Sequence, residues 1–466
     1  MDRMESVERG LGASPSDSRA RSGRAYLLAS VAALGGVLFG YDTAAISGAI
    51  GFLETRFSLD EVQKGWVVAS LLVGCIAGSS FAGMLSDRIG RRGVLRACAV
   101  LFAVSGVASA IPRTVSELVA ARIACGLAVG AVSGLSPLYI AEVAPPRIRG
   151  RLVSLNQVAI IGGMLVVYTV NSLIASRDAS WNADMGWRWM LGSEAIPALV
   201  FLALLCLVPE SPRWLVGRGR EAEAEAILAS LGGPVQARAE IEEIRAAIAE
   251  ERGSIRELLG PGTRVAIAIA VCLAVLQQIT GINVVLYYAP EIFKIAGVEA
   301  VQAIGHTVLV GAVNFGFTFV AIGLVDRLGR RPLLLATSLG MGASLFLLGF
   351  AFRWDLPRGW VLGCTLAYVA SFAVAMGPVV WVVLAEIFPA RLRGSAMSVA
   401  TFFLWLACFC VAQTAPLLLS EGKGLGPART FWMYGTLCAV AFVFVLLFVP
   451  ETKGKTLEEI GRSWKE

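Results

Sequence analysis

The feature that most constrains the fold of this chain is a series of long apolar runs separated by polar segments. We place twelve runs, at residues 25–52, 65–85, 94–111, 115–140, 153–175, 188–208, 264–293, 304–325, 332–352, 360–387, 396–419 and 430–449. A helix needs about 20 such residues to cross the hydrocarbon core of a bilayer. Backbone groups must find their hydrogen bonds within the segment there, so each run predicts a transmembrane helix.

The composition agrees with a membrane protein and excludes several other classes. Hydrophobic residues make up 56% of the chain and charged residues only 16%, whereas about a quarter of a soluble domain is charged. The nine cysteines stand inside apolar stretches without metal or disulfide spacing. The basic residues form no single clustered face for nucleic acid. We find no catalytic constellation, metal site or nucleotide-binding loop, so the sequence predicts neither an enzyme nor an ATP-driven pump.

Charge also predicts the topology. Most of the 40 Lys and Arg residues fall on the side that holds both termini, which places both termini in the cytoplasm. Residues 1–24 are polar and predict a disordered cytoplasmic tail, and residues 450–466 a short cytoplasmic C-terminal tail. The longest loop, 209–263, carries Glu and Arg at helical spacing and predicts short amphipathic helices at the inner surface.

The segments 25–208 and 264–449 repeat each other. Three motifs recur in the same order about 240 residues apart, namely "DRIGRR" (87–92) and "DRLGRR" (326–331), "EVAPPRIRG" (142–150) and "EIFPARLRG" (386–394), and "PESPR" (209–213) and "PETKG" (450–454). Two six-helix halves around a central cavity are a plan of transporters, which bind substrate near the bilayer midplane. The sequence therefore predicts an all-α integral membrane protein with twelve transmembrane helices in two six-helix repeats.

The repeated motifs pair acids with arginines on the cytoplasmic side. Anchoring by positive loops explains the arginines but not the matched acids. We expect a cytoplasmic gate whose charges pair when the inner side is closed, formed by Asp87, Arg88, Arg91, Glu142, Arg149, Asp326, Arg330, Glu386 and Arg393. Because such pairs meet water when the gate opens, each one contributes modestly.

The stretches "PESPRWL", "QQITGINVVLYYAPEIF", "DRLGRRP" and "PETKGKTLEEI" resemble the sugar porters of the major facilitator superfamily, from about residue 25 to 460. The chain resembles in particular the bacterial proton-coupled symporters for xylose, arabinose, galactose and glucose. The resemblance implies the major facilitator fold and a monomer in the plasma (inner) membrane. It also implies import of a pentose or hexose by alternating access, with the proton as coupling ion and no cofactor.

A sugar site needs groups that both donate and accept hydrogen bonds, and flat aromatic walls. Gln277, Gln278, Asn283 and Tyr287 supply them within one apolar run; amides that only join helices are the alternative. The resemblance implies a sugar site at Phe39, Gln157, Gln277, Gln278, Asn283, Tyr287, Asn314, Trp381 and Trp405. Met164 and Leu404 stand where xylose symporters of the family carry glutamines, so the identity of the sugar is open.

Asp42 is the one carboxylate in "GGVLFGYDTAAISGAI" (35–50), and a charge at that depth is costly unless it is neutralised. Arg122, inside the run 115–140, is the partner that we expect. Arg122 favours ionised Asp42 and desolvation favours the protonated acid, so the pair predicts proton coupling; a static ion pair is the alternative. By the resemblance, symporters carry an acid here and facilitators an asparagine.

Three other functions fit the sequence less well. An uncoupled facilitative uniporter of the same fold is the nearest alternative. A sugar sensor typically carries a long cytoplasmic tail, and a drug or organic-ion carrier is expected to have a more apolar cavity. His306, the only histidine, has no acid or cysteine beside it and predicts no metal site.

Overall fold

A computed structural model describes residues 15–250, 260, 263–388 and 390–453 of the chain. The described residues form helices and no strands, and twelve helical spans are long and apolar enough to cross a membrane. The predicted all-helical membrane fold is confirmed.

The N-terminal half holds the first six spans. Its elements are α2 (Pro15–Phe57), α3 (Glu61–Ile89), α4 (Arg91–Ala110), α5 (Val115–Val143), α6 (Arg149–Ala175), α7 (Ala179–Trp181), a π-helical turn (Asn182–Gly186), α8 (Trp187–Gly192) and α9 (Ala195–Leu205). Helix α2 begins ten residues earlier than the predicted span, so residues 15–24 of the expected tail are helical. The remainder of that tail, 1–14, lies outside the described residues.

The C-terminal half holds the other six spans. Its elements are α13 (Arg264–Ile279), α14 (Ile282–Ile295), α15 (Ala300–Leu328), α16 (Arg330–Arg353), α17 (Arg358–Ser371), a π-helical turn (Phe372–Met376), α18 (Pro378–Glu386), α19 (Ala390–Leu419) and α20 (Pro427–Phe448). The seventh span breaks at Gly281, whose φ of 92° is left-handed, a conformation that glycine adopts without strain. A Cβ there would lie 2.8 Å from the Tyr434 ring, so the position also has no room for a side chain.

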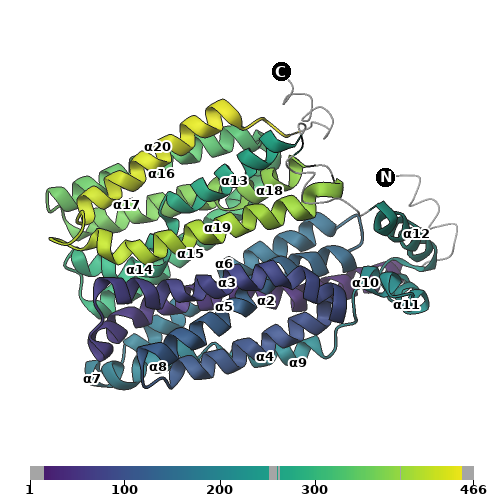
Figure 1. Ribbon diagram of the computed structural model, residues 1–466, viewed down its shortest axis with the longest axis horizontal. Coiled ribbons are helices and arrows are strands. Elements are labelled where there is room, and N and C mark those ends of the chain that lie inside the picture. The colour runs from purple at the N-terminus through teal and green to yellow at the C-terminus, as the bar shows by residue number, and fades with distance from the viewer. Residues whose placement is uncertain (1–14, 251–259, 261–262, 389, 454–466) are drawn as a thin grey trace.

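Three short helices of the segment 209–263 lie at one end of the bundle (Figure 1), and the placement of this end at the inner membrane surface stays a prediction. They are α10 (Pro212–Gly217), α11 (Glu221–Gly232) and α12 (Pro234–Glu250), and they share a small core. The end of the predicted linker, 251–259 and 261–262, lies outside the described residues, as do residues 454–466 of the C-terminal tail.

Figure 1 shows the two halves as two layers, α2 to α9 below and α13 to α20 above. The layers meet where α3 packs on α19, α6 on α15 and α2 on α14. The contact is close enough that a Cβ on Gly65 of α3 would lie 2.2 Å from the carbonyl oxygen of Gln413 on α19. Any central site in this protein is therefore assembled from both halves.

Candidate functional site

The repeated motifs converge on one charge cluster in each half. In the N-terminal half, Glu142 Oε2 accepts from Arg91 Nε at 3.2 Å and from Ser211 Oγ at 2.5 Å. In the C-terminal half, Glu386 accepts from Arg330 Nε and Nη2 at 3.2 and 2.9 Å, and from the hydroxyl of Thr452 at 2.6 Å. The three sequence repeats are thus three parts of one repeated structure.

A second acid in each cluster caps the N-terminus of a helix. Glu210 accepts from the backbone N–H of Arg92 at 3.1 Å, and Glu451 from those of Arg330 and Arg331, both at 3.0 Å. These carboxylates satisfy the first amide groups of α4 and α16, which have no partner within the helix. Partial burial works against ionised Glu451, but the backbone hydrogen bonds prevail and hold its pKa below the ordinary value.

The ion pairs of the predicted gate that the structure shows do not cross the interface between the halves. Arg91 also pairs with Asp87 at 2.9 Å, within the N-terminal half. Arg149 lies 3.6 Å from Glu240 of α12, and burial raises the pKa of Glu240 although Arg149 opposes this. The closing of a gate across the interface therefore stays a prediction.

Three other members of the predicted gate have different surroundings. Arg88 is exposed, and Arg393 is half-buried with a buried Nε that makes no hydrogen bond. The side chain of Asp326 lies outside the part of the chain that the structure describes. Among the described residues, no ion pair joins Arg88 or Arg393 to the charge clusters, and the part of all three residues in the gate stays a prediction.

The predicted amides form a connected cluster around the break in the seventh span. Gln277 Nε2 donates to the carbonyls of Met376 and Gly377 at 2.6 and 3.1 Å. Gln278 Nε2 donates to Gln277 Oε1 at 3.1 Å, and Asn283 Nδ2 to Gln278 Oε1 at 2.5 Å. We call Gln277, Gln278 and Asn283 the amide cluster. It joins α13, α14 and the break before α18.

Cys408 of α19 completes this cluster and was not predicted. Its Sγ lies 3.1 Å from Asn283 Nδ2 and 3.8 Å from the hydroxyl of Tyr287. The sequence pattern gave this cysteine no part in the site. Cys408 stands three residues after Trp405, on the same helix face, and this spacing is the signal that could have found it.

The aromatic residues of the predicted site meet across the two halves. The rings of Phe39 on α2 and Trp405 on α19 have centroids 5.8 Å apart. Trp405 Nε1 is buried and makes no hydrogen bond. Asn314 on α15 is buried, and Gln157 on α6 is half-buried.

Trp381 of α18 is also half-buried. In the described part of the chain, no hydrogen bond joins Gln157, Asn314 or Trp381 to the amide cluster. Their assignment therefore rests on the family resemblance, whereas that of the amide cluster also rests on geometry.

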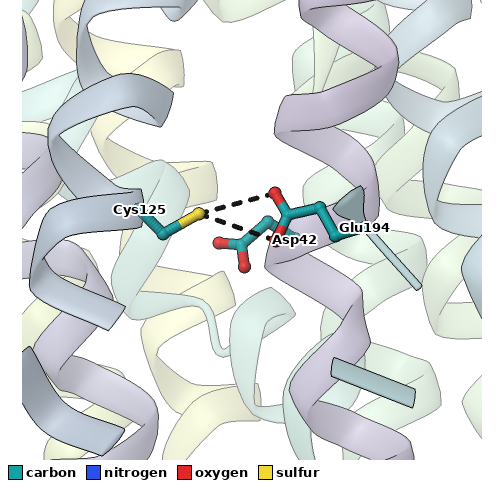
Figure 2. A group of neighbouring side chains, drawn as sticks. All are labelled: Asp42, Cys125 and Glu194. Atoms are coloured by element: carbon teal, nitrogen blue, oxygen red, sulfur yellow. Dashed lines mark hydrogen bonds between the residues drawn. The ribbon is translucent and has the colours of Figure 1, made fainter. Parts of the chain in front are cut away.

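Asp42 has a neighbour that the sequence analysis missed. Figure 2 shows Asp42 of α2, Cys125 of α5 and Glu194 from the turn before α9. The three side chains are 4%, 1% and 2% exposed, and Cys125 Sγ lies 3.4 and 3.7 Å from the two carboxylate oxygens of Glu194. One ligand atom from each of the three lies within 4.8 Å of the others, so the spacing also fits a cation.

We call Asp42, Cys125 and Glu194 the acid cluster. Asp42 is the one acid of its own apolar stretch, but Glu194 from another run shares its site. Glu194 stands inside the run 188–208, where the reasoning that singled out Asp42 could have found it. The two carboxylates lie close enough that their charges oppose each other when both are ionised.

Arg122 lies near the acid cluster but makes no direct hydrogen bond to Asp42. Its Nε donates to the carbonyl of Val67 at 2.9 Å, and its charge acts on both Asp42 and Glu194. Arg122 Nη2 and Asp42 Oδ2 are both buried without a hydrogen bond. Arg122 and Asp42 are therefore neighbours without a hydrogen bond between them, and the part of this pair in proton coupling stays a prediction.

Comparison with known proteins agrees with these features. Residues 28–464 match the family described as "Sugar (and other) transporter". The chain is 46% identical over 465 residues to the D-xylose-proton symporter of Escherichia coli (strain K12), covering 93% of this chain and 94% of that protein. It is 41% identical over 441 residues to the arabinose-proton symporter of Bacillus subtilis (strain 168), covering 94% of each.

The structure also matches the inward-open conformation of the xylose transporter XylE from E. coli. The TM-score is 0.84 at 44% sequence identity, and the match covers 94% of this chain and 100% of that one. The resemblance inferred from the motifs is confirmed: the chain belongs to the sugar transporter family.

Proposed function

We propose that this protein is a proton-coupled importer of a monosaccharide, a pentose or a hexose, that works by alternating access. The observation that carries the proposal is the acid cluster, in which Asp42 Oδ2 is buried without a hydrogen bond beside Glu194 and Arg122. Similarity to xylose-proton and arabinose-proton symporters supports both the sugar and the proton. An intramembrane acid of this kind marks an ion or proton pathway.

The sugar is held between the halves, with the amide cluster as its main polar surface. Amide groups offer both donors and acceptors to sugar hydroxyls, and Phe39 and Trp405 offer an aromatic wall to the apolar faces of the ring. Trp405 Nε1 is a further donor without a partner. Leu404 and Met164 are buried at 3% and 6% exposure, so their helices present apolar groups where a glutamine would add an amide.

The proton is held in the N-terminal half. Two carboxylates and one guanidinium in a dry site cannot all remain ionised without a large desolvation cost. Asp42 and Glu194 therefore share a proton while the site is closed, and release it when water reaches the site from the inner side. Arg122 favours that release because its charge stabilises the ionised acids.

We also infer that the protein lies in the plasma (inner) membrane and works as a monomer, as the family resemblance implies. The positive-inside distribution of Lys and Arg favours cytoplasmic termini, and an even number of spans is consistent with both ends on one side. Large apolar side chains such as Leu207 and Leu173, which are 81% and 66% exposed, suit a lipid environment.

The test is uptake of labelled pentoses and hexoses into proteoliposomes with and without an imposed pH gradient. We expect one sugar or a small group of sugars to accumulate above the outside concentration only when the outside is more acidic. Equilibration that ignores the gradient would identify an uncoupled facilitator. Uptake of none of the sugars would contradict the substrate class.

A further inference from the structure

The outer ends of the two halves are joined by a charge cluster that the mechanism above does not use. Lys64 Nζ, at the start of α3, lies 2.6 Å from Glu54 Oε2 and 3.1 Å from Glu291 Oε2. Glu54 ends α2 in the same half, whereas Glu291 stands on α14 in the other half. Lys294 of α14 pairs with Glu291 at 2.8 Å. We call these four residues the outer cluster.

The outer cluster lies where the two halves are in close contact. The neighbouring Gly65 leaves no room for a side chain against Gln413, whose Nε2 donates to the carbonyl of Val62 at 3.0 Å. A Cβ on Gly51 of α2 would lie 2.3 Å from Lys294 Nζ. The outer side is therefore closed in this conformation, with backbone against backbone and charge against charge.

Each ion of the bridge between the halves has a second partner in its own half. When α3 and α14 move apart, Lys64 remains paired with Glu54. Glu291 remains paired with Lys294. Breaking a buried pair is costly mainly when one charge is left uncompensated, and here neither charge is. The Lys64–Glu291 bridge can therefore break and re-form in every cycle at a moderate cost.

Burial makes this bridge differ from an ordinary surface pair. The side chains of Lys64 and Glu291 are 8% and 15% exposed, so water and salt screen them less than they screen exposed ions. At the inner ends, the Arg91–Glu142 pair lies within the N-terminal half and the Arg330–Glu386 pair within the C-terminal half. Of the ion pairs named here, Lys64–Glu291 is the one that joins the two halves, beside the Gln413–Val62 hydrogen bond.

We propose that Lys64 is a positioning residue of the transport cycle: its bridge to Glu291 holds the outer side closed and must break before the cavity opens outward. The proposal rests on the alternating-access part of the proposed function. It assigns to Lys64 the balance between outward-open and inward-open forms, and to Glu54 and Lys294 the role of partners that remain in the open form.

The test is hydrogen–deuterium exchange measured by mass spectrometry on the full chain in detergent. Lys64→Met keeps the side-chain length and removes the charge. We expect exchange to rise in peptides that cover the outer ends of α3 and α14 and to fall in the inner peptide 143–152. A roughly tenfold change in the balance corresponds to about 1.4 kcal/mol.

Lys294→Met is the matched control, because it removes the other lysine bound to Glu291 but leaves the bridge between the halves. It should leave exchange at α3 and at 143–152 as in the wild type, and Lys64→Arg should do the same. The double variant Lys64→Met/Glu291→Gln should match Lys64→Met alone, because both changes break one bridge.

Wild-type exchange in Lys64→Met, or an equal effect of Lys294→Met, would overturn the proposal. If Lys64→Met does not fold, Glu291→Gln breaks the same bridge from the other half and is read in the same way. Failure of the proposed function is distinguishable, since it appears as absent sugar uptake by the wild type whatever the exchange pattern.

Discussion

The two halves of the bundle bury their polar groups in different ways. In the C-terminal half, Gln277, Gln278 and Asn283 pass hydrogen bonds along a chain that ends on the carbonyls before α18. In the N-terminal half, Asp42 Oδ2 and Arg122 Nη2 are buried with no hydrogen bond. The amide cluster is a neutral network joined by hydrogen bonds, whereas Asp42 and Arg122 carry charged groups with buried atoms that have no hydrogen bond.

This difference indicates how the two tasks are divided. A satisfied network is rigid and presents its remaining donors and acceptors in fixed positions, which suits recognition of sugar hydroxyls. An unsatisfied carboxylate beside a second acid changes its charge state when water enters, which suits proton binding. We therefore expect variants of the N-terminal cluster to change coupling, and variants of the C-terminal cluster to change affinity.

The largest effect is expected from Asp42→Asn, which is nearly isosteric and cannot take up a proton. One proton driven by about 100 mV supplies roughly 2.3 kcal/mol, enough for close to a 50-fold sugar gradient. The variant should lose this accumulation and keep sugar binding. Accumulation is measured with labelled sugar in energised proteoliposomes, and sugar binding is measured at equilibrium as the control. Loss of accumulation together with loss of binding would contradict the assignment of coupling and recognition to different halves.

A smaller effect is expected from Gln278→Ala and Asn283→Ala. Each removes a hydrogen bond worth about 0.5–1.5 kcal/mol, so sugar affinity should fall by roughly two- to tenfold while proton coupling of the bound sugar persists. Gln236→Ala, which removes an amide from α12 outside the bundle, is the matched control. Equilibrium binding that is unchanged in both site variants would remove the amide cluster from the sugar site.

Variants of Cys408 should change sugar affinity less than variants of the amide cluster. Cys408→Ser keeps a hydrogen-bonding group beside Asn283 and should bind sugar with nearly wild-type affinity. Cys408→Ala leaves Asn283 without that neighbour and should weaken binding by about two- to threefold, in line with one weak hydrogen bond. Isothermal titration of both variants measures this, and a weaker serine variant than alanine variant would mean that the thiol only fills space.

The smallest effect on stability is expected from the two capping acids, Glu210 and Glu451, which occupy equivalent positions in the two halves. Glu451→Gln and Glu210→Gln each weaken the capping of a helix start, which costs about 1 kcal/mol or less at neutral pH. Because the folded-state pKa of Glu451 is depressed, its stabilisation is present above the ordinary value of 4.5 and is lost as the pH falls through the folded value. The melting temperature of Glu451→Gln should thus approach that of the wild type in acid. A difference that is independent of pH would contradict an electrostatic role.

The sequence predicted the helical spans because apolar length is a local signal. It also predicted the inner motifs, since they occur twice. It did not predict that Ser211 and Thr452, which belong to the third repeated motif, bond the acids of the second motif, because each hydroxyl reaches an acid more than 60 residues away. Cys408 likewise contacts Asn283 across 125 residues.

Two charged residues were missed for a different reason. Lys64 stands directly before the run 65–85, where an expected water boundary hides the cost of a charge. Glu194 stands inside the run 188–208, but its contact with Asp42 depends on how the helices pack. The structure buries Lys64 and Glu194, at 7% and 2% exposure. The burial of a charged side chain in a membrane protein depends on how neighbouring helices pack around it. The limits of the apolar runs in the sequence do not show this packing.

The measurement that tests the central claim most directly is the pH change of the medium when sugar is added to lightly buffered, de-energised vesicles. We predict alkalinisation of the medium on addition of a transported sugar by the wild type, and none by Asp42→Asn, which still binds sugar. Alkalinisation that survives in Asp42→Asn would mean that the proton crosses elsewhere. No alkalinisation in the wild type, with sugar entering the vesicles, would mean that the protein is an uncoupled facilitator.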